Sequence, residues 1–486
     1  MTILFSTARH ARKGGARSVA GTLALSFALL AAAGAQAKEI VTIGIGTQNT
    51  TTNTVTGGVV IKELGLLQKF LPKTGKYADI DFKLEWQNST SGPPITNGMM
   101  ANKIQIGMMG DYPLLVNGAI GQGSSGNETE LIAIIAYNQF GAGNGVVVHK
   151  DSPYYQLSDL KGKTLSVPFG SAAHGMVLQA MQARGWGNDY WNMVSQSPEV
   201  GTTNLQEKKI DAHADFVPFP DLLPFRGFAR KIFDGVETRI PTFHGVVVRK
   251  DFADKYPEVV VAYIKALMAA DEWLRKNPKL AAEDIEKWTG IEKEVAYLFL
   301  GPGGIHTLDP TIKPILVDAI KTDHAVLEKL NRVKPLDVKA WVNEKYVREA
   351  FKENGLDYDA QKKSLENYYN VSGHDPICNK DISNPKAAAE IWIEGGDIVP
   401  VSSPVCAFKG IAQYRKAGKK VAVSYVYDQA LGIKVFGSKA FYSMSGSTPA
   451  KMEVVPFLLK KDAEAYAKKN GGSVVTYEQV LAKMEK

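Results

Sequence analysis

Two nearly identical segments, 100 residues apart, constrain the fold of this chain more than any other feature. They read GVVVHKD at Gly145–Asp151 and GVVVRKD at Gly245–Asp251. The spacing is too long for a stacked structural repeat, whose period is about 20–50 residues. It favours a chain that crosses from one lobe into a second lobe and later returns. The alternative is a coincidence between two valine-rich strands.

Strand-like and helix-like segments alternate on both sides of this pair. Lys38–Ile45 and Ile104–Met109 are strand-like, whereas Gly57–Phe70 and Pro257–Pro278 carry apolar residues at helical spacing. This alternation predicts an α/β fold with a parallel sheet. With 486 residues, the chain is also too long for one core. We expect lobe 1 at residues 38–140 and 245–350, lobe 2 at 141–244, a linker at 351–373 and a small α+β domain at 374–486.

Residues 1–37 have the organisation of a secretory signal peptide. Four basic residues precede the apolar run Val19–Gly34, and Ala35–Ala37 reads Ala-Gln-Ala, a small-residue cleavage site. The apolar run is shorter than the roughly 20 residues of a membrane-spanning helix. No later stretch is long and apolar enough to span a bilayer. We therefore expect an exported protein that does not insert into the membrane.

The charge balance gives no sign of a polyanionic partner. The chain has 57 Lys and Arg against 50 Asp and Glu, and four of these basic residues belong to the expected signal peptide. The remaining net charge of +3 is too small to indicate binding to nucleic acid or anionic lipid. The sequence contains no nucleophile elbow, P-loop, zinc-protease motif or dinucleotide fingerprint, which argues against those enzyme classes.

Four polar segments occupy the position where open α/β sheets bind ligands, beyond the carboxyl ends of strands and beside helix N-termini. Each follows a strand-like run: Thr47–Asn53, Gly110–Pro113, Gly170–His174 and Asp215–Pro218. The first is dense in amides and hydroxyls. We expect the binding site to be assembled from these four segments.

The stretch PFGSAAHGMVLQAM, Pro168–Met181, reads as a turn that opens a helix. The N–H groups at a helix start lack partners and carry partial positive charge, so an anionic or strongly polar group can bind there without a lysine. Gly170 would let the ligand approach, and Ser171 would supply a hydroxyl. The alternative is an ordinary helix cap. His174 is either a donor to the same ligand or a capping residue.

The other two turns have the same double interpretation. Asp111 and Asp215 either accept hydrogen bonds from a ligand or cap a turn, and Tyr112 and Phe216 either line a cleft or pack in a core. Three histidines have no spacing typical of a metal site: His149, His213 and His244.

Three stretches resemble one family of binding proteins. They are NKIQIGMMGDYPLLVNGAIGQG at Asn102–Gly123, YQLSDLKGKTLSVPFGSAAHGMVLQAM at Tyr155–Met181 and EKKIDAHADFVPFP at Glu207–Pro220. They contain a Gly-Asp-x-Pro turn, an Asp-Leu-Lys-Gly-Lys segment before the glycine-serine helix start, and a late Asp-Ala. On these motifs the chain resembles the periplasmic solute-binding proteins of ABC importers, in the nitrate/sulfonate/taurine (NMT1-like) branch.

The resemblance implies an α/β, two-lobed type II periplasmic-binding-protein fold with a hinge of two crossover strands. It implies a periplasmic protein that is not an enzyme and has no certain cofactor or nucleic-acid partner. Lobe closure would capture a small polar or anionic solute, such as a sulfonate, nitrate or organic acid, for delivery to an inner-membrane permease. The ligand contacts expected from the family positions and the helix start are Gln48, Asn49, Asp111, Tyr112, Gly170, Ser171, His174, Asp215 and Phe216.

The last quarter of the chain resembles metal-associated modules. His374–Tyr414, which begins His-Asp-Pro-Ile-Cys, resembles a YHS-type module. Ser447–Leu481 resembles the end of the copper-binding accessory lipoprotein of nitrous oxide reductase, the NosL type. These resemblances imply copper bound by Cys378, Cys406 and Met452, since thiolates and thioethers suit Cu(I).

Departures from these patterns leave alternatives open. Ser402 stands where the YHS pattern has a cysteine, and Ala450 stands where the NosL pattern has a methionine. Cys378 and Cys406 would meet an oxidising compartment, so a structural disulfide is an alternative to a metal site, and two free thiols are a third.

Two other functions remain as alternatives. One is uptake or handling of a transition metal or metal complex, with Asp111, His174 and Asp215 as ligands in the cleft. The other is an enzyme, because the same fold resembles the pyrimidine synthase of thiamine biosynthesis. That family carries a cysteine-rich iron motif, whereas both cysteines of this chain lie outside the two-lobed region.

Overall fold

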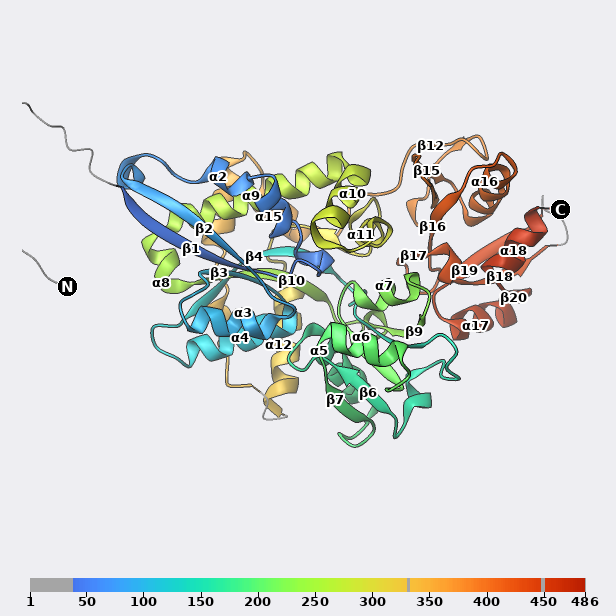
Figure 1. Cartoon of the computed structure of the whole chain (residues 1–486), viewed down its shortest axis with the longest axis horizontal. Coiled ribbons are helices and arrows are strands. Elements are labelled where there is room, and N and C mark those ends of the chain that lie inside the picture. The colour runs from blue at the N-terminus through green and yellow to red at the C-terminus, as the bar shows by residue number, and fades with distance from the viewer. Residues whose placement is uncertain (1–37, 330–332, 447–450, 486) are drawn as a thin grey trace, which may run out of the picture.

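The computed structural model describes residues 38–329, 333–446 and 451–485 (Figure 1). The expected signal peptide at residues 1–37 lies outside this part, as do residues 330–332, 447–450 and 486. Within the described part, no helix combines the length and the apolar composition needed to cross a bilayer. The described chain forms two α/β lobes and a C-terminal α+β unit.

Lobe 1 is built on a six-stranded sheet with the order β11-β4-β10-β3-β1-β2. β1 runs parallel to β2 and β3, and β10 runs antiparallel to both of its neighbours. Every residue of β3 and β10 is buried, as expected for central strands covered on both faces. The strands are β1 (Glu39–Thr47), β2 (Ile80–Asn88), β3 (Ile106–Gly110), β4 (Thr129–Asn138), β10 (Thr242–Arg249) and β11 (Thr307–Leu308).

Helices flank this sheet on both sides, with α3 and α4 on one side and α9 on the other in Figure 1. The long helix α9 buries a stripe of apolar residues at spacings of three and four, which is why its sequence pattern predicted a helix. The helices are α1 (Val59–Glu63), α2 (Leu66–Phe70), α3 (Gly92–Met100), α4 (Asp111–Gln122), α8 (Lys250–Lys255), α9 (Pro257–Lys276), α10 (Pro278–Thr289), α11 (Lys293–Leu300), α12 (Pro314–Lys329), α13 (Val338–Trp341), α14 (Lys345–Glu353) and α15 (Tyr358–Lys363), with short 3₁₀ turns η1 (Thr52–Thr54) and η2 (Gly75–Tyr77).

Lobe 2 is built on a five-stranded sheet with the order β7-β6-β8-β5-β9. β6 runs parallel to β7 and β8, whereas β5 runs antiparallel to β8 and β9. Its elements are β5 (Gly145–His149), η3 (Leu157–Leu160), β6 (Thr164–Val167), α5 (Ala172–Arg184), β7 (Asn192–Ser195), α6 (Pro198–Gln206), β8 (Ala212–Asp215), α7 (Phe219–Phe225), β9 (Ala229–Asp234) and η4 (Gly235–Thr238).

The chain passes between the lobes twice. Residues 139–144 connect β4 to β5, and residues 235–241 connect β9 back to β10. The two valine-rich segments therefore lie in β5 and β10, one in each sheet, which confirms the crossover interpretation. Asp234 ties the two crossovers together, because its Oδ1 accepts hydrogen bonds from Gly143 N (3.3 Å) and Val236 N (3.0 Å).

Two predicted elements differ from the structure. Gly57–Phe70, expected as one helix, is divided into α1 and α2 at Gly65, whose φ of +60° is left-handed and interrupts a right-handed helix. Gly110–Pro113, expected as a loop, already contains the first turn of α4, which begins at Asp111.

The stretch expected to be a linker, residues 351–373, contains α15. Tyr358 of this helix is buried, and its hydroxyl accepts a hydrogen bond from the backbone N–H of Ile312 (3.2 Å). This part of the stretch therefore packs onto lobe 1. Its polar composition gave no sign of that contact.

The C-terminal unit contains two small antiparallel sheets, with the orders β15-β14-β16-β17 and β19-β18-β20, and a hairpin of β12 and β13. Its elements are β12 (His374–Asp375), β13 (Lys380–Asp381), η5 (Pro385–Ala387), β14 (Ala389–Ile393), β15 (Ile398–Val401), α16 (Pro404–Lys416), β16 (Val421–Tyr427), β17 (Lys434–Phe436), η6 (Gly437–Lys439), β18 (Phe441–Ser445), β19 (Glu453–Phe457), α17 (Lys460–Asn470), β20 (Ser473–Thr476) and α18 (Tyr477–Met484).

The C-terminal unit, orange to red in Figure 1, packs against both lobes. On lobe 1, Tyr297 of α11 lies 5.3 Å from Tyr425 of β16, measured between ring centres. On lobe 2, Phe225 of α7 lies 5.1 Å from Phe436 of β17. The unit therefore contacts both lobes.

Candidate functional site

The N-termini of α4 and α5 face each other where the two lobes meet. Gly110 precedes α4, and a methyl group added to it would lie 3.1 Å from the Cβ of Ala172 at the start of α5. The rings of Tyr112 and His174 are 5.7 Å apart across the same contact. The structure thus brings together the second and third of the four predicted segments.

The side chains at the start of α5 build the helix cap. Ser171 Oγ accepts a hydrogen bond from His174 N (3.3 Å), and Gly170 N donates to His174 Nδ1 (3.1 Å). The φ of +79° at Gly170 is left-handed, which favours glycine there. Ser171 therefore caps the helix, as the alternative interpretation expected. A contact between Ser171 and a solute remains a prediction. The N–H groups of Ala172 and Ala173, in the first turn, have no partner within the helix.

Asp111 links α4 to β10. Its Oδ1 accepts a hydrogen bond from the N–H of Tyr112 (2.7 Å). Its Oδ2 accepts from Thr242 Oγ1 (2.6 Å) and from Phe243 N (3.3 Å). Burial raises the pKa of Asp111 to about 6, and these hydrogen bonds oppose the shift. Asp111 thus stands at the boundary of the lobes, with hydrogen bonds within lobe 1.

The fourth predicted segment, Asp215–Pro218, makes its hydrogen bonds and ring contacts inside lobe 2. Asp215 is fully buried, with Oδ2 2.9 Å from His213 Nε2 and Oδ1 accepting from Phe216 N (2.8 Å). Burial raises its pKa, and His213 opposes the shift. The ring of Phe216 packs edge-on against Phe219. These contacts give Asp215 and Phe216 a structural role, and solute contact by either residue remains a prediction.

Gln48 and Asn49 hold the loop that follows β1. Gln48 Nε2 donates to the carbonyl oxygen of Met108 (3.1 Å). Asn49 Oδ1 accepts from Thr47 Oγ1 (2.8 Å), and Asn49 N donates to Asn88 Oδ1 (2.9 Å). Both side chains thus support the loop, and the residues that follow them turn into the interior.

Six polar residues are buried where the crossovers enter the lobes. They come from the loop after β1, the first crossover, the start of β10 and the loop after α11, and each has more than nine-tenths of its surface buried. We call them the interlobe cluster: Thr51, Thr52, Asn53, Asn144, His244 and His306.

Contacts join members of this cluster to one another and to the neighbouring crossover and strand. Asn53 Nδ2 lies 3.3 Å from His244 Nδ1. His306 packs beside the first crossover, because a Cβ on Gly143 would lie 2.6 Å from its Cε1 atom. Asn144, the next residue, donates from Nδ2 to Thr242 Oγ1 (3.2 Å) at the start of β10. The cluster therefore lies at the loop after β1, the first crossover and the start of β10.

Many polar atoms of the cluster have no hydrogen-bond partner within the described part of the chain. They are Oγ1 of Thr51 and Thr52 and Oδ1 of Asn53 and Asn144. Buried polar atoms in native proteins are nearly always paired, so a concentration of unpaired ones indicates a place for another molecule. Such a molecule would need both hydrogen-bond donors and acceptors.

Burial works against the charged form of both histidines in the cluster. Burial lowers the pKa of His244 to about 3. Burial, with the charges of His244 and Lys231, also lowers the pKa of His306 well below its ordinary value, against the effect of the Ala142 backbone. The interlobe cluster therefore offers hydrogen-bonding groups, and its burial disfavours a positive charge on either histidine.

Comparison with known proteins identifies the family of this chain. A model of the NMT1-like family matches residues 36–288, just over half of the chain. The chain belongs to the NMT1-like family. Over 306 residues it is 24% identical to the "Putative aliphatic sulfonates-binding protein" of Bacillus subtilis (strain 168), a match that covers 61% of this chain and 85% of that protein. It is 28% identical over 196 residues to the taurine-binding periplasmic protein of Escherichia coli (strain K12), over 40% of this chain and 58% of that protein.

A solved structure shows the same fold as this NMT1-like chain. The alkanesulfonate-binding protein SsuA from Xanthomonas axonopodis pv. citri, bound to MOPS, matches with a TM-score of 0.54 at 18% identity, over 63% of this chain and 100% of that chain. Membership of this family, together with the two-lobed fold, identifies this chain as a solute-binding protein. The family match ends at residue 288, so the C-terminal unit lies outside it.

Most of the cluster in this NMT1-like protein was missed by sequence reasoning. The loop Thr47–Asn53 was predicted to contribute to the site, but the ligand contacts expected from it were Gln48 and Asn49. A usable signal did exist for two residues, because Asn144 and His244 each stand immediately before one of the two valine-rich segments. His306 lies in a stretch without any motif.

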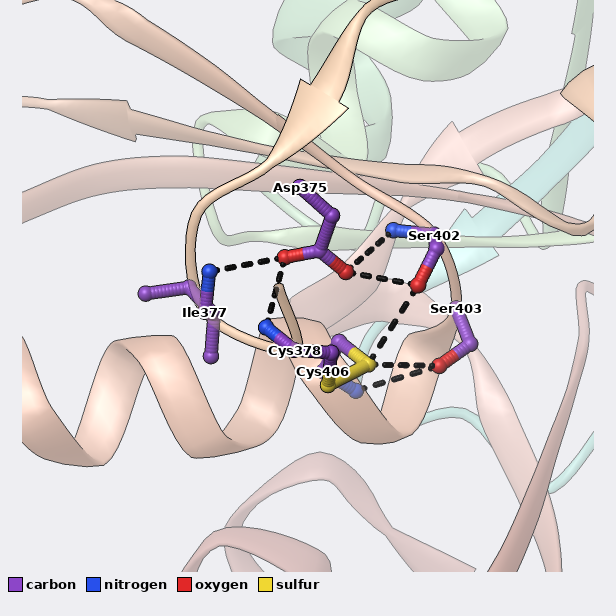
Figure 2. Close-up of a disulfide and its surroundings, with 6 residues drawn as sticks. All are labelled: Asp375, Ile377, Cys378, Ser402, Ser403 and Cys406. Atoms are coloured by element: carbon purple, nitrogen blue, oxygen red, sulfur yellow. Dashed lines mark hydrogen bonds between the residues drawn. A yellow bond between two sulfur atoms is a disulfide. The ribbon is translucent and has the colours of Figure 1, made fainter. Parts of the chain in front are cut away.

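Cys378 and Cys406 of the C-terminal unit form a disulfide (Figure 2). Around it, Asp375 accepts four hydrogen bonds: from Ile377 N (2.8 Å), Cys378 N (2.9 Å), Ser402 N (2.8 Å) and Ser402 Oγ (2.6 Å). Burial alone would raise the pKa of Asp375, but these hydrogen bonds outweigh burial and lower the pKa. The disulfide is one of the three alternatives that the sequence left open.

The predicted copper site does not fit this arrangement as it stands. One ligand atom each from Asp375, Cys378 and Cys406 lie within 4.8 Å of one another, which is compatible with a metal. However, the two sulfurs are bonded to each other, and the carboxylate already holds four donors. Copper binding would require the reduced pair. Met452, the third predicted ligand, packs against the hydrophobic core.

Proposed function

We propose that this protein is exported to the periplasm, captures a small polar or anionic solute in the interlobe cluster by lobe closure, and delivers it to an ABC permease in the inner membrane. The unpaired buried atoms of the cluster support this proposal, because a bound solute would supply the missing hydrogen bonds. The relatives named for sulfonates and taurine favour a small organic oxyanion as the solute.

The arrangement suggests how such a solute is held. The N–H groups that open α5 and the hydroxyls of Thr51 and Thr52 provide donors, and helix N-termini favour negative charge. The cluster belongs to lobe 1 and the first crossover, so a solute in it favours the closed arrangement only if it also bonds to groups of lobe 2, such as the N–H groups at the start of α5. Binding involves no covalent step, so the proposal is a binding protein and not an enzyme.

Metal uptake through the cleft has less support. The three residues considered as metal ligands there are Asp111, His174 and Asp215. Within the described residues, the single group of His, Cys, Asp and Glu side chains with close ligand atoms is the one at the disulfide. Asp215 also has both carboxylate oxygens engaged inside lobe 2. A copper role for the C-terminal unit remains a separate prediction.

Replacing Thr52 by valine tests the proposed site. Its hydroxyl is buried without a partner, so Thr52→Val should raise the free energy of unfolding of the solute-free protein by about 1 kcal/mol. The same change should weaken solute binding by about tenfold, since one hydrogen bond to the solute is lost. Thermal unfolding measures the first effect. Calorimetric titration with taurine, ethanesulfonate, nitrate and succinate measures the second.

Thr202→Val is the matched control. Thr202 of α6 also has a buried, unpaired hydroxyl, but it lies in lobe 2 outside the cluster. This variant should gain similar stability and bind every solute as the wild type does. Equal binding by both variants would place the solute elsewhere, and no binding by the wild type to any of the four compounds would contradict the proposed solute class.

A further inference from the structure

A cavity of about 320 Å³ lies between lobe 2 and the C-terminal unit. Residues of β9 and of the segment around α7 line it from lobe 2, and residues of β17, η6 and the start of α18 line it from the C-terminal unit. Small-molecule sites in proteins measure about 300–1,000 Å³, so this cavity has room for a small organic molecule. None of the six residues of the interlobe cluster lines it, so it is a different site.

Buried apolar side chains line the interior of this cavity. They are Ala229 of β9 together with Val435, Phe436, Ala440, Leu458 and Tyr477 of the C-terminal unit. Phe436 also packs against Phe225 of α7, so lobe 2 and the C-terminal unit are in contact beside the cavity. An apolar body placed there would be removed from water, which favours binding.

The charged residues that line the cavity have an excess of two positive charges. Four are basic and two are acidic: Lys150, Arg230, Lys231 and Lys439 against Asp221 and Glu478. Lys231 is already committed, because its Nζ lies 2.8 Å from Asp221 Oδ2 and 2.8 Å from Asp234 Oδ2. Lys150 is exposed and lies 3.8 Å from the carboxylate of Asp151. The positive charge available to a ligand therefore comes from Arg230 and Lys439.

Arg230 is held in the cavity wall without an acidic partner in the described chain. Its Cζ atom lies 3.9 Å from the ring centre of Tyr155, and its Nη2 donates to the carbonyl oxygen of Ser152 (2.8 Å). Burial lowers the pKa of Arg230 and Tyr155 opposes the shift, but a guanidinium stays protonated at neutral pH. It has five N–H donors, so it can hold a carboxylate and keep its bond to Ser152.

Lys439 of η6 lines the same cavity from the C-terminal unit and keeps contact with solvent. Partial burial lowers its pKa, and no acidic residue in the described part of the chain opposes this shift. A nearby anion would favour the charged form of this lysine. Arg230 and Lys439 thus approach the cavity from its two sides, and neither has a negative partner there.

We propose that the cavity binds an amphipathic organic acid, with its apolar body between lobe 2 and the C-terminal unit and its anionic group at Arg230 and Lys439. The apolar interior and the excess of positive charge each match one part of such a molecule. The site is separate from the interlobe cluster, so the inference does not depend on which solute is transported. A ligand in it contacts lobe 2 and the C-terminal unit at once and holds these two parts together.

Naphthalene-2-carboxylate and naphthalene-2-carboxamide are suitable probes, because they have nearly the same shape and differ by one negative charge. We expect the carboxylate to bind the wild type about tenfold or more tightly than the amide, since it alone carries a charge that pairs with Arg230. Calorimetric titration of the full chain measures both dissociation constants. Equal affinities, or no binding of the carboxylate, would overturn the proposal.

Arg230→Gln should lower the affinity for the carboxylate about tenfold and leave the affinity for the amide unchanged. Because the amide reports on the apolar cavity, this pattern separates a loss of charge from a loss of folding. Lys439→Gln should lower the carboxylate affinity about threefold, since Lys439 keeps contact with solvent. Lys416→Gln is the control, because Lys416 is exposed at the end of α16 in the same unit and does not line the cavity. It should bind both probes as the wild type does.

Thr52→Val shows which of the two sites the carboxylate occupies. This variant should bind the carboxylate as the wild type does, because Thr52 belongs to the interlobe cluster. Weaker carboxylate binding in Thr52→Val, with none in Arg230→Gln and Lys439→Gln, would place the carboxylate in the interlobe cluster. That result would overturn the second site and leave the proposed function standing. If Arg230→Gln weakens both probes, the selective loss expected for Lys439→Gln decides, and its absence overturns the proposal.

Discussion

Replacing Lys434 by methionine is expected to lower the free energy of unfolding by about 3–5 kcal/mol. Lys434 lies on β17 with its side chain fully buried, and its Nζ is 2.5 Å from Glu390 Oε2 and 3.0 Å from the carbonyl oxygen of Pro302 in lobe 1. Glu390 also accepts from the hydroxyl of Tyr297 in α11 (2.6 Å). Without the lysine, Glu390 stays buried as an unpaired charge at the boundary between the C-terminal unit and lobe 1.

Chemical unfolding of the full chain measures this effect. The double variant Lys434→Met/Glu390→Gln should recover most of the lost stability, because no unpaired charge then remains. Lys420→Met is the control, since Lys420 forms an exposed pair with Glu394 (3.8 Å) and should cost less than about 1 kcal/mol. Equal losses for Lys434→Met and Lys420→Met would show that the buried pair does not hold the C-terminal unit in place.

Gly141→Ala is expected to destabilise the protein by several kcal/mol and to weaken solute binding, because the two crossovers touch at this residue. A Cβ there would lie 2.4 Å from the carbonyl oxygen of Ile240 and 2.8 Å from that of Gly235, both in the second crossover. These are backbone atoms, so relief requires the crossovers to separate. The φ of +92° at Gly141 adds strain for any other residue.

Gly162→Ala separates the two causes. Gly162 has a φ of +72°, and nothing lies within 4 Å of the added Cβ. This variant therefore measures the cost of the left-handed backbone alone, about 1–2 kcal/mol. Urea unfolding and calorimetric titration should show a larger stability loss, and a loss of binding, for Gly141→Ala only. Equal effects of the two substitutions would contradict a close approach of the crossovers.

The sequence predicted the architecture well because the fold depends on local patterns. Apolar runs and helical spacing are properties of neighbouring residues, and they identified β1, β3 and α9 correctly. The alternation predicted a parallel sheet, whereas both sheets are mixed, because the strands next to the crossovers, β5 and β10, run antiparallel to their neighbours. The pair GVVVHKD and GVVVRKD gave the two passages between the lobes. The division of α1 from α2 escaped prediction because it depends on the backbone angle of a single residue, Gly65.

The candidate site was less accessible to prediction because it depends on long-range packing. Ser171 and Asp111 were located at the meeting of the lobes, but their hydrogen bonds serve the helix starts. Thr52 turns inward within η1, which nothing in the loop composition distinguishes from its neighbours. His306 reaches the cluster only because the loop after α11 packs against the first crossover.

The most direct test of the account is a crystal structure of the full chain grown with taurine. The account predicts the molecule enclosed between the lobes, with a hydrogen bond to at least one of the unpaired atoms of Thr51, Thr52 or Asn144. Closed lobes with those atoms bonded to one another, or taurine bound only on the outer surface, would contradict it.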